Sequence, residues 1–378
     1  MRIAIDARYV QDHFPGIARY TFNLVRALAG LGSDVGWVVI HNPAQKNSRY
    51  DVASLARLPG VELQVSSVPT FSLAEQIQLP RLARRLSVDL WHSPYYVMPY
   101  RLGIPVVLTF YDAIAHHFPD TLAAPWKRPP VELLTRMAVR TAQRFVAISA
   151  VAAEDLERFY GVAPSRVSVT PLGVDEHFVP QDPSVVAEAA SRYGLERPYV
   201  LYLASNKPHK NLPRLLQAWH IARGEGRLAS FRLVVAGHWD PRFPEAREMA
   251  ERLGLGESVH FAGPVAEADL PAVYSGADLF VFPSLYEGFG LPVLEAMACG
   301  TPVVCSNTSS LPEVAGDAAL TVDPLDVSAL AAAIRNVLSD AGLRDELRRR
   351  GLVRAASFSW TRTGQQTLEV YRQVMTDL

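Results

Sequence analysis

The segment from Leu279 to Gly300 reads LFVFPSLYEGFGLPVLEAMACG, and it decides the fold class. Its first four residues predict a buried strand, a loop with two glycines follows, and a helix is expected from about Leu291 with Pro292 in its first turn, where proline is favoured. The two glycines, Gly288 and Gly290, let a ligand approach the backbone closely, and the N-terminus of a helix suits a diphosphate. The segment therefore predicts one strand–loop–helix unit of a parallel α/β sheet.

Short β-branched runs alternate with longer helical patterns on both sides of this segment, which is typical of parallel α/β sheets. Strands are expected at residues 3–6, 37–40, 63–65, 90–92, 106–110, 144–148 and 167–170, and then at 199–203, 231–236, 259–261, 279–282, 303–305 and 319–322. Helices are expected at residues 16–30, 73–86, 130–140 and 151–160, and then at 211–223, 245–253, 268–276, 292–299, 327–339, 344–356 and 361–374. This pattern predicts two doubly wound Rossmann-like domains whose ligands bind at the carboxyl ends of the strands, in a cleft between the domains.

The alternation of strand and helix patterns is interrupted once, where Pro180, Pro183 and Pro198 surround a short helical segment. We therefore expect an N-terminal domain over residues 1–178, a linker over 179–197 and a second domain over 198–357.

Composition excludes several classes of protein. The chain has 378 residues, of which 49% are hydrophobic, and a formal net charge of -1, so nothing global favours a nucleic-acid partner. Two cysteines are too few for a disulfide framework, and no apolar run reaches the roughly 18 residues of a spanning helix, so a cytoplasmic location is expected. The sequence lacks G-x-G-x-x-G after a strand, a P-loop and Asp-x-Asp, which disfavours a dehydrogenase, a P-loop NTPase and a metal-dependent transferase. We therefore expect no metal and no cofactor.

Two carboxylates flank the glycine turn. A carboxylate beside a phosphate would repel it, so Glu287 and Glu295 are better suited to accepting hydrogen bonds from sugar hydroxyls, Glu287 from a transferred sugar and Glu295 from a ribose. Two solvated glutamates at a helix N-terminus explain the local sequence equally well.

A basic loop follows the strand at 199–203. Lysine is rare in this chain and occurs only at Lys46, Lys127, Lys207 and Lys210. Two of these lie in the loop that begins at Ala204-Ser205, where a cation would stabilise a departing diphosphate without a metal ion. The alternative is a polar loop whose lysines are solvated.

Polar residues also follow strands in the N-terminal half. Tyr111 and Asp112 come directly after the strand at 106–110, with His116 and His117 a few residues later. The segment His92–Tyr95 follows another strand, and it either lines an acceptor cleft or forms a buried packing cluster. Gly16 precedes the first helix, where its N–H suits a phosphate or an acceptor, although loop flexibility explains the glycine as well.

The pattern EGFGLPxLEAMACG strongly resembles the Glu-x7-Glu motif of glycosyltransferase family 4, which contains retaining enzymes of the GT-B fold. Four further segments resemble motifs of that family in the same order, so the resemblance covers nearly the whole chain. They are Gly16–Tyr20, Thr170–Asp175, Asn206–Asn211 and Leu311–Val314.

The resemblance implies a role for each matched residue. Glu287 contacts the donor hexose, Glu295 binds the ribose and Lys210 binds the diphosphate. The backbone of the glycine turn, with the neighbouring basic loop and the N-terminal glycine, completes donor binding through Gly16, Ser205, Lys207, Gly288, Phe289, Gly290 and Leu291. Two departures stand out: Ala204-Ser205 where many members have Gly-Arg, and Tyr111 where they have a histidine near the transferred sugar. Tyr111, Asp112 and His116 or His117 are the candidates for that place, and a terminal helix over 358–378 is expected to return to the N-terminal domain.

The expected activity is that of a metal-independent, retaining hexosyltransferase. The form of the basic loop looks most like bacterial mannosyltransferases of polysaccharide assembly, which favours GDP-mannose over UDP-glucose or another UDP-hexose as donor. The acceptor is expected to be a saccharide or a lipid-linked saccharide, and a peripheral membrane contact through Arg81, Arg84 and Arg85 competes with a solvated helix face. A sugar-nucleotide 2-epimerase and a non-catalytic binding protein stay open as alternatives.

Overall fold

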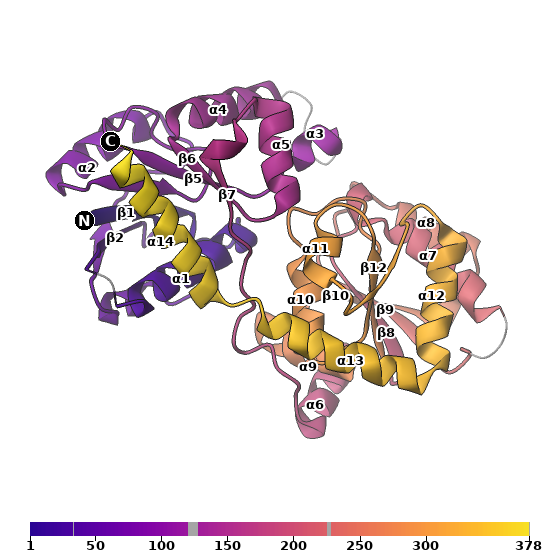
Figure 1. Cartoon of the computed structure of the whole chain (residues 1–378). Helices are drawn as coiled ribbons and strands as arrows, with labels where there is room; N and C mark the ends of the chain where they lie inside the picture. Colours follow the sequence, from indigo (N-terminus) through magenta and orange to yellow (C-terminus); the bar gives the residue numbers. More distant parts are fainter. Residues whose placement is uncertain (33, 120–127, 225–227, 378) are drawn as a thin grey trace. The chain divides into compact units, whose positions relative to one another are not determined.

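The computed structural model describes residues 1–32, 34–119, 128–224 and 228–377, and Figure 1 traces the chain. The chain forms two compact units. Unit 1 comprises Met1–Ala115, Leu122–Gly173 and Ser359–Leu378, and unit 2 comprises His116–Thr121 and Val174–Phe358.

Unit 1 is built on a parallel sheet of seven strands in the order β3-β2-β1-β4-β5-β6-β7. The strands are β1 (Arg2–Asp6), β2 (Gly36–His41), β3 (Val61–Val65), β4 (Leu90–Ser93), β5 (Val106–Phe110), β6 (Arg144–Ala147) and β7 (Val167–Val169). In the middle of the sheet, β1 lies between β2 and β4, with Ile3 opposite Trp37 on one side and Leu90 on the other. The strand order reverses between β1 and β4, and at such a switch point ligands bind beyond the carboxyl ends of the strands.

Helices connect the strands of unit 1, and the last helix of the chain joins them. They are α1 (Pro15–Gly30), α2 (Glu75–Arg85), α4 (Arg128–Thr141), α5 (Ala150–Tyr160) and α14 (Trp360–Thr376). The short helix α3 (Ile114–His117) is divided, because its last two residues belong to unit 2. The terminal helix α14 runs beside α1 (Figure 1), and the approach is so close that a Cβ on Gly364 would lie 2.9 Å from the Cβ of Ala27. The last helix of the chain is therefore part of the N-terminal unit.

Unit 2 has a parallel sheet of six strands in the order β10-β9-β8-β11-β12-β13. Its strands are β8 (Tyr199–Leu203), β9 (Arg232–Ala236), β10 (Val259–Gly263), β11 (Leu279–Phe282), β12 (Val303–Ser306) and β13 (Leu320–Val322). Its helices are α6 (Pro183–Tyr193), α7 (Leu212–Arg223), α8 (Glu245–Arg252), α9 (Leu270–Gly276), α10 (Leu291–Ala298), α11 (Leu311–Ala315), α12 (Val327–Ser339) and α13 (Ala341–Ala356). Apolar side chains of α7 and α12, including Trp219 and Ile334, pack with Leu279 and Val281 of β11 in one buried core.

The predicted fold class is confirmed: both sheets are parallel and doubly wound, and each expected strand is present within two residues of its predicted bounds. The short helices α3 and α11 were not expected, since neither is long enough to show a helical period.

The linker over 179–197 needs a correction. Pro183 begins the helix α6, where its fixed φ suits the first turn, and the helix buries Val186 and Ala189 in unit 2. This stretch is therefore part of a folded unit, and the boundary between the units falls instead at Gly173 and Val174.

Candidate functional site

The glycine turn that follows β11 depends on Gly290. Its φ of 113° lies in a region that residues with side chains rarely adopt, and a Cβ there would lie 2.6 Å from Cδ2 of Leu311. The N–H groups of Val293 and Leu294 bond back to the Gly290 carbonyl, and Pro292 has no N–H group. Among the described residues of this first helical turn, the N–H group of Leu291 is therefore the one that has no backbone acceptor and is available to a ligand.

Lys210 and Glu287, which the sequence assigns to a diphosphate and to a sugar, bind each other. The ammonium Nζ of Lys210 lies 2.7 Å from Oε1 and 2.9 Å from Oε2 of Glu287, and 5.4 Å from the centre of the Phe282 ring. The two side chains are 17% and 12% exposed, so the pair is partly screened from water. Two opposite charges are thus held together at the carboxyl edge of the sheet, within reach of a ligand.

Hydrogen bonds to backbone carbonyls hold the basic loop in place. Lys210 ends a 3₁₀ turn over Pro208–Lys210, and Asn211 follows with a φ of 59°. The side-chain amide of Asn211 donates to the carbonyl of Pro283 at 3.0 Å, and the backbone N–H of Leu285 donates to the carbonyl of His209 at 2.7 Å. The loop that carries Lys210 is therefore fastened to the loop that carries Glu287.

His209 is a site residue that the sequence analysis missed. Burial, followed by the neighbouring Lys210 and Lys207, lowers the pKa of His209 to about 3, so the ring is neutral at pH 7. Its Nδ1 atom is buried and has no hydrogen-bond partner among the described residues. Its position between the two lysines of the loop is the only signal for it in the sequence.

Ser309 and Ser310 are a second feature that the sequence analysis missed, and they position Glu287. The Ser309 hydroxyl accepts from the N–H of Glu287 at 3.0 Å and donates to its carbonyl at 2.7 Å. The Ser310 hydroxyl lies 2.9 Å from the Glu287 carbonyl and 2.7 Å from that of Phe289. The segment before α11 therefore sets the backbone of the glycine turn, a role that no local pattern around the two serines indicates.

Glu295 lies inside α10 and is only 4% exposed. The hydroxyl of Tyr274 in α9 donates to its Oε2 at 2.9 Å. This contact excludes the solvated alternative for Glu295, because the carboxylate is buried. A ribose that binds this carboxylate would find it already oriented by Tyr274.

The remaining donor-side predictions lie in the same two loops of unit 2. Ser205 and Lys207 follow β8, and the Ser205 carbonyl accepts from the Tyr202 hydroxyl at 2.9 Å. Gly288 and Phe289 lie in the turn before α10, and the Phe289 ring is buried against Phe358. The structure thus brings together all the predicted donor residues except Gly16, which is the second residue of α1 in unit 1.

In unit 1, Tyr111 follows β5, as predicted, and points into protein. Its ring packs edge-on against Tyr20 at 5.6 Å between centroids, and burial raises the pKa of Tyr111 well above its ordinary value. The hydroxyl is buried without a hydrogen-bond partner among the described residues. Asp112 accepts from the N–H of Ile114 at 3.0 Å and so caps α3, at whose end His116 and His117 lie.

The packing interpretation of His92–Tyr95 is confirmed for His92, while the acceptor interpretation stays a prediction for Tyr95. His92 is fully buried, with its ring nitrogens bonded to the hydroxyls of Tyr371 in α14 and, at 2.7 Å, of Thr109 in β5. Burial lowers the pKa of His92 to about 3, so this histidine is a neutral packing residue. Tyr95, in contrast, is only partly buried beyond the strand end.

Other features bear on metals and membranes. The described residues contain no group of three or more His, Cys, Asp or Glu side chains arranged to hold a metal ion. Among the helices described, none is both long and apolar enough to span a bilayer. Arg81 and Arg85 of α2 border a hollow of about 340 Å³ with Gln78, Leu82 and residues 65–68, while Arg84 lies on an exposed part of the same helix.

Comparisons with known proteins agree with this arrangement. Residues 15–178 match the family model described as Glycosyltransferase Family 4, and residues 188–353 match Glycosyl transferases group 1. The chain is 30% identical to the O-antigen chain mannosyltransferase B of Escherichia coli over 98% of this chain and 100% of that protein. It is 33% identical to the MMP alpha-(1->4)-mannosyltransferase of Mycolicibacterium hassiacum over 73% of this chain and 67% of that protein. Among solved structures, Anabaena HepE in complex with UDP and glucose superposes with a TM-score of 0.75 at 18% identity, over 99% of this chain and 100% of that one.

The two parallel, doubly wound sheets have the GT-B fold, and the family models and the full-length relative from E. coli identify the chain as a glycosyltransferase. The chain belongs to glycosyltransferase family 4, and it is similar to the E. coli mannosyltransferase over 98% of its length.

Proposed function

We propose that this glycosyltransferase moves a mannosyl residue from GDP-mannose to a saccharide or lipid-linked saccharide, with retention of configuration and without a metal ion. The observation that carries the proposal is the ion pair between Lys210 and Glu287. A nucleotide sugar offers a diphosphate to the ammonium and hydroxyls to the carboxylate, so one ligand replaces both partners of the pair. Mannose is favoured because the relatives described above, from E. coli and M. hassiacum, are named mannosyltransferases.

The chemistry needs a stabilised leaving group more than a nucleophilic side chain. As the bond between the anomeric carbon and the diphosphate oxygen breaks, negative charge grows on that oxygen, and Lys210 and the free N–H of Leu291 stabilise it. The acceptor hydroxyl attacks the same face of the sugar, and its proton passes to the departing diphosphate oxygen. The new glycosidic bond then keeps the configuration of the donor, and the nucleoside diphosphate is released.

Tyr111 and Asp112 are proposed to line the acceptor side of this reaction, with His116 or His117 as alternatives for the same place. The hydroxyl of Tyr111 is buried and unpartnered, so the Tyr111 side chain would have to turn outward to donate a hydrogen bond to the acceptor, and it lacks the charge that a histidine can carry. The enzyme is proposed to work in the cytoplasm, with a peripheral membrane contact through Arg81, Arg84 and Arg85 if the acceptor is lipid-linked.

UDP-glucose or another UDP-hexose is the second candidate donor, because the neighbour HepE was solved with UDP and glucose. A panel of GDP- and UDP-sugars, with and without EDTA, tests the proposal through binding and slow hydrolysis. We expect one preferred donor whose hydrolysis is unchanged by EDTA. Hydrolysis that EDTA abolishes would contradict the metal-free reaction, and an α-linked donor that gives a β-linked product, seen by NMR, would contradict retention.

The same panel separates the other activities. Conversion of a donor to its C2 epimer without any acceptor would identify an epimerase. Binding of a donor without turnover on any acceptor would favour a non-catalytic binding protein.

A further inference from the structure

Four aromatic side chains of unit 1 gather where β1 and β4 end and before α2 begins. Phe14 precedes α1, Phe71 lies in the loop before α2, and Tyr95 and Tyr96 follow β4. We call these four residues the aromatic shelf. Their ring centroids are 6.0 Å apart for Phe14 and Phe71, 5.4 Å for Phe14 and Tyr95, and 4.0 Å for Tyr95 and Tyr96.

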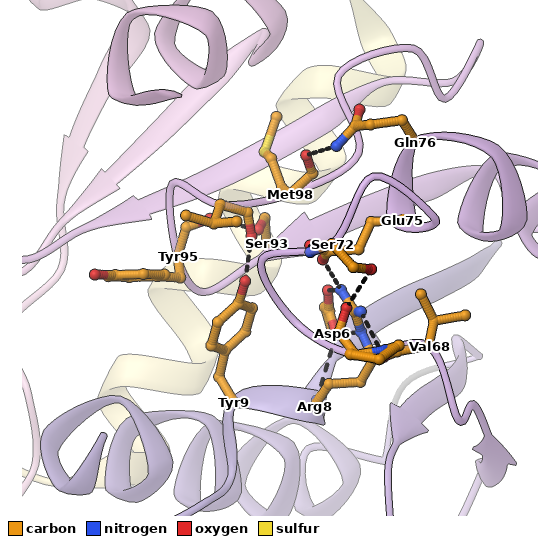
Figure 2. Close-up of polar contacts among 12 residues, drawn as sticks. Asp6, Arg8, Tyr9, Val68, Ser72, Glu75, Gln76, Ser93, Tyr95 and Met98 are labelled. Atoms are coloured by element: carbon orange, nitrogen blue, oxygen red, sulfur yellow. Dashed lines mark hydrogen bonds and ion pairs between the residues drawn. The ribbon is translucent and has the colours of Figure 1, made fainter. Parts of the chain in front are cut away.

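A buried residue supports the shelf from below. Tyr9 is fully buried, its hydroxyl donates to the carbonyl of Val97, and its ring contacts Phe14 at 5.7 Å and Tyr95 at 5.2 Å. Figure 2 shows Tyr9 and Tyr95 beside each other at the end of the sheet. The shelf therefore packs on the core through Tyr9, while Phe71 is exposed and the other three residues are partly buried.

Phe71 occupies its place at a conformational cost. Its φ is 62°, which residues with a side chain rarely adopt, yet 52% of the residue is exposed to solvent. Folding gains little from an exposed ring in an unfavourable backbone conformation. Such outliers persist where the surrounding structure enforces them, and they are concentrated at binding sites.

A buried ionic network enforces the conformation of the Phe71 loop. The guanidinium of Arg8 binds Asp6 and Glu75, each at 2.7 Å, and also donates to the carbonyl of Val68 at 3.2 Å. Glu75 in turn accepts from the N–H of Ser72 at 3.0 Å. Figure 2 shows these residues converging around Arg8, so the loop is clamped on both sides of Phe71 before any ligand arrives.

The carboxylate of Asp112 acts on the two tyrosines of the shelf, and the ring of His13 packs edge-on against Phe14 with the centroids 4.5 Å apart. Burial first, and then the neighbouring Tyr96 and Asp112, raise the pKa of Tyr95, and burial and Asp112 also raise that of Tyr96. Arg8, the cation that acts on Tyr9, is fully buried between two carboxylates. A phosphate on this shelf would meet the carboxylate of Asp112, whereas a neutral diol would find in it a hydrogen-bond acceptor.

We infer that the aromatic shelf binds a neutral pyranose ring, the acceptor end of an unphosphorylated saccharide, through Phe14, Phe71 and Tyr95. The C–H groups on one face of a pyranose pack against aromatic rings, while its rim hydroxyls reach the paired Tyr95 and Tyr96 hydroxyls, which lie 2.8 Å apart. The shelf lies beyond the carboxyl ends of parallel strands, where such sheets bind ligands. The inference deepens the proposed function and rests on it for the identity of this ligand as an acceptor.

Saturation-transfer difference NMR on the full chain, with no donor present, tests the inference. The probes are the methyl α-glycosides of mannose, glucose, galactose and N-acetylglucosamine, together with mannose 6-phosphate. We expect transfer to at least one neutral glycoside, weaker transfer to mannose 6-phosphate, and a loss of about fivefold or more in Phe71→Gly, because exposed aromatic anchors carry much of a binding energy. Phe71→Gly also removes the unfavourable φ, so a loss of binding in this variant is not a loss of folding.

Leu73→Ala is the matched control, because Leu73 lies two residues away and is 89% exposed but is not part of the shelf. This variant is expected to keep its glycoside binding. The inference is overturned if no neutral glycoside binds, if Phe71→Gly binds as well as the wild type, if Leu73→Ala loses as much as Phe71→Gly, or if mannose 6-phosphate binds as tightly as the neutral sugars. Phe71-dependent binding to phosphatidylglycerol vesicles that no glycoside displaces would instead assign the shelf to lipid.

Donor hydrolysis separates this inference from the proposed function. If Phe71→Gly and the wild type both hydrolyse GDP-mannose and neither binds a glycoside, the shelf assignment fails alone. If glycosides bind and no nucleotide sugar is hydrolysed or transferred, the proposed transferase reaction fails and the saccharide site stands.

Discussion

The carboxyl edges of the two sheets are built from different chemistry. In unit 2, the edge presents an ion pair between Lys210 and Glu287 and a buried carboxylate at Glu295. In unit 1, the corresponding edge presents aromatic rings over Tyr9, and its strongest charges are sealed inside the network around Arg8. The same sheet topology thus offers charge to a ligand in one unit and apolar area in the other, which matches a charged donor and a neutral acceptor.

The largest effect is expected from removing Lys210, the cation of the charged edge of unit 2. Lys210→Ala should lower turnover by about two orders of magnitude, since removal of a group that stabilises a leaving charge costs about 3 kcal/mol. Steady-state kinetics with the preferred donor measures the change. Lys46→Ala, at an exposed lysine outside both loops of the site, is the control and should keep its turnover. Near-normal turnover of Lys210→Ala would refute the diphosphate role.

The second effect concerns the edge of unit 1 and the helix α14 that packs on it. The folded chain holds His92 neutral, with a pKa of about 3, whereas the unfolded chain binds a proton below about pH 6.5. The unfolded state therefore gains protons as the pH falls, and the free energy of unfolding should drop by about 2 kcal/mol between pH 7 and pH 5 through this residue.

Urea unfolding of the wild type and of His92→Gln at both pH values measures this loss. The variant should show a smaller pH-dependent difference, and the exposed His220→Gln should behave like the wild type. An equal difference in His92→Gln and the wild type would mean that other groups govern the acid sensitivity.

The third effect asks whether the buried carboxylate of unit 2 binds the nucleotide. Glu295→Gln should weaken the binding of GDP, even without a sugar, by about tenfold, because a hydrogen bond to a charged group contributes about 1.5 kcal/mol or more. Calorimetry with GDP measures the affinity. Tyr274→Phe removes only the hydroxyl that orients Glu295 and should lose less. Unchanged affinity in Glu295→Gln would exclude the ribose contact.

The smallest effect is expected at Gly16, near the start of α1 in unit 1. Gly16 has an ordinary φ, and a Cβ there would meet no atom within 4 Å, so Gly16→Ala should stabilise the fold by about 0.5–1 kcal/mol. We expect it nevertheless to slow transfer severalfold, because the methyl group takes space that the substrates need. Gly30→Ala, at the other end of the same helix and equally open, should stabilise without slowing transfer. Unchanged transfer in both variants would remove Gly16 from the site.

The positions of the predicted donor-side residues could be inferred because these residues are close in the sequence. The glycine turn and the residues that follow it occupy one strand–loop–helix segment, and the basic loop follows a single strand, so spacing places the side chains at a strand end or in the next helix. Their roles toward a donor come from the family resemblance and stay predictions. What spacing missed depends on neighbours far along the chain. Ser309 and Ser310 position Glu287 across the sheet, and Asn211 fastens the two loops through Pro283.

The features that the sequence predicted wrongly also depend on neighbours far along the chain. The prolines before residue 198 predicted a linker, yet Pro183 begins a helix whose apolar face is buried in unit 2. His92 and Tyr95 belong to one short motif, but His92 is fully buried against Tyr371 of α14 and Tyr95 is only partly buried. This distinction depends on packing rather than on spacing.

By itself, the sequence determined the two parallel sheets, the order of their strands along the chain and the residues of the charged edge, because hydrophobic periodicity and loop motifs are local properties. Only the tertiary structure decided that Lys210 and Glu287 pair with each other, that Tyr111 carries a buried and unpartnered hydroxyl, and that four distant aromatic residues form one shelf. These features arise where separate segments meet, and the free energy that brings the segments together comes from burial across the whole unit.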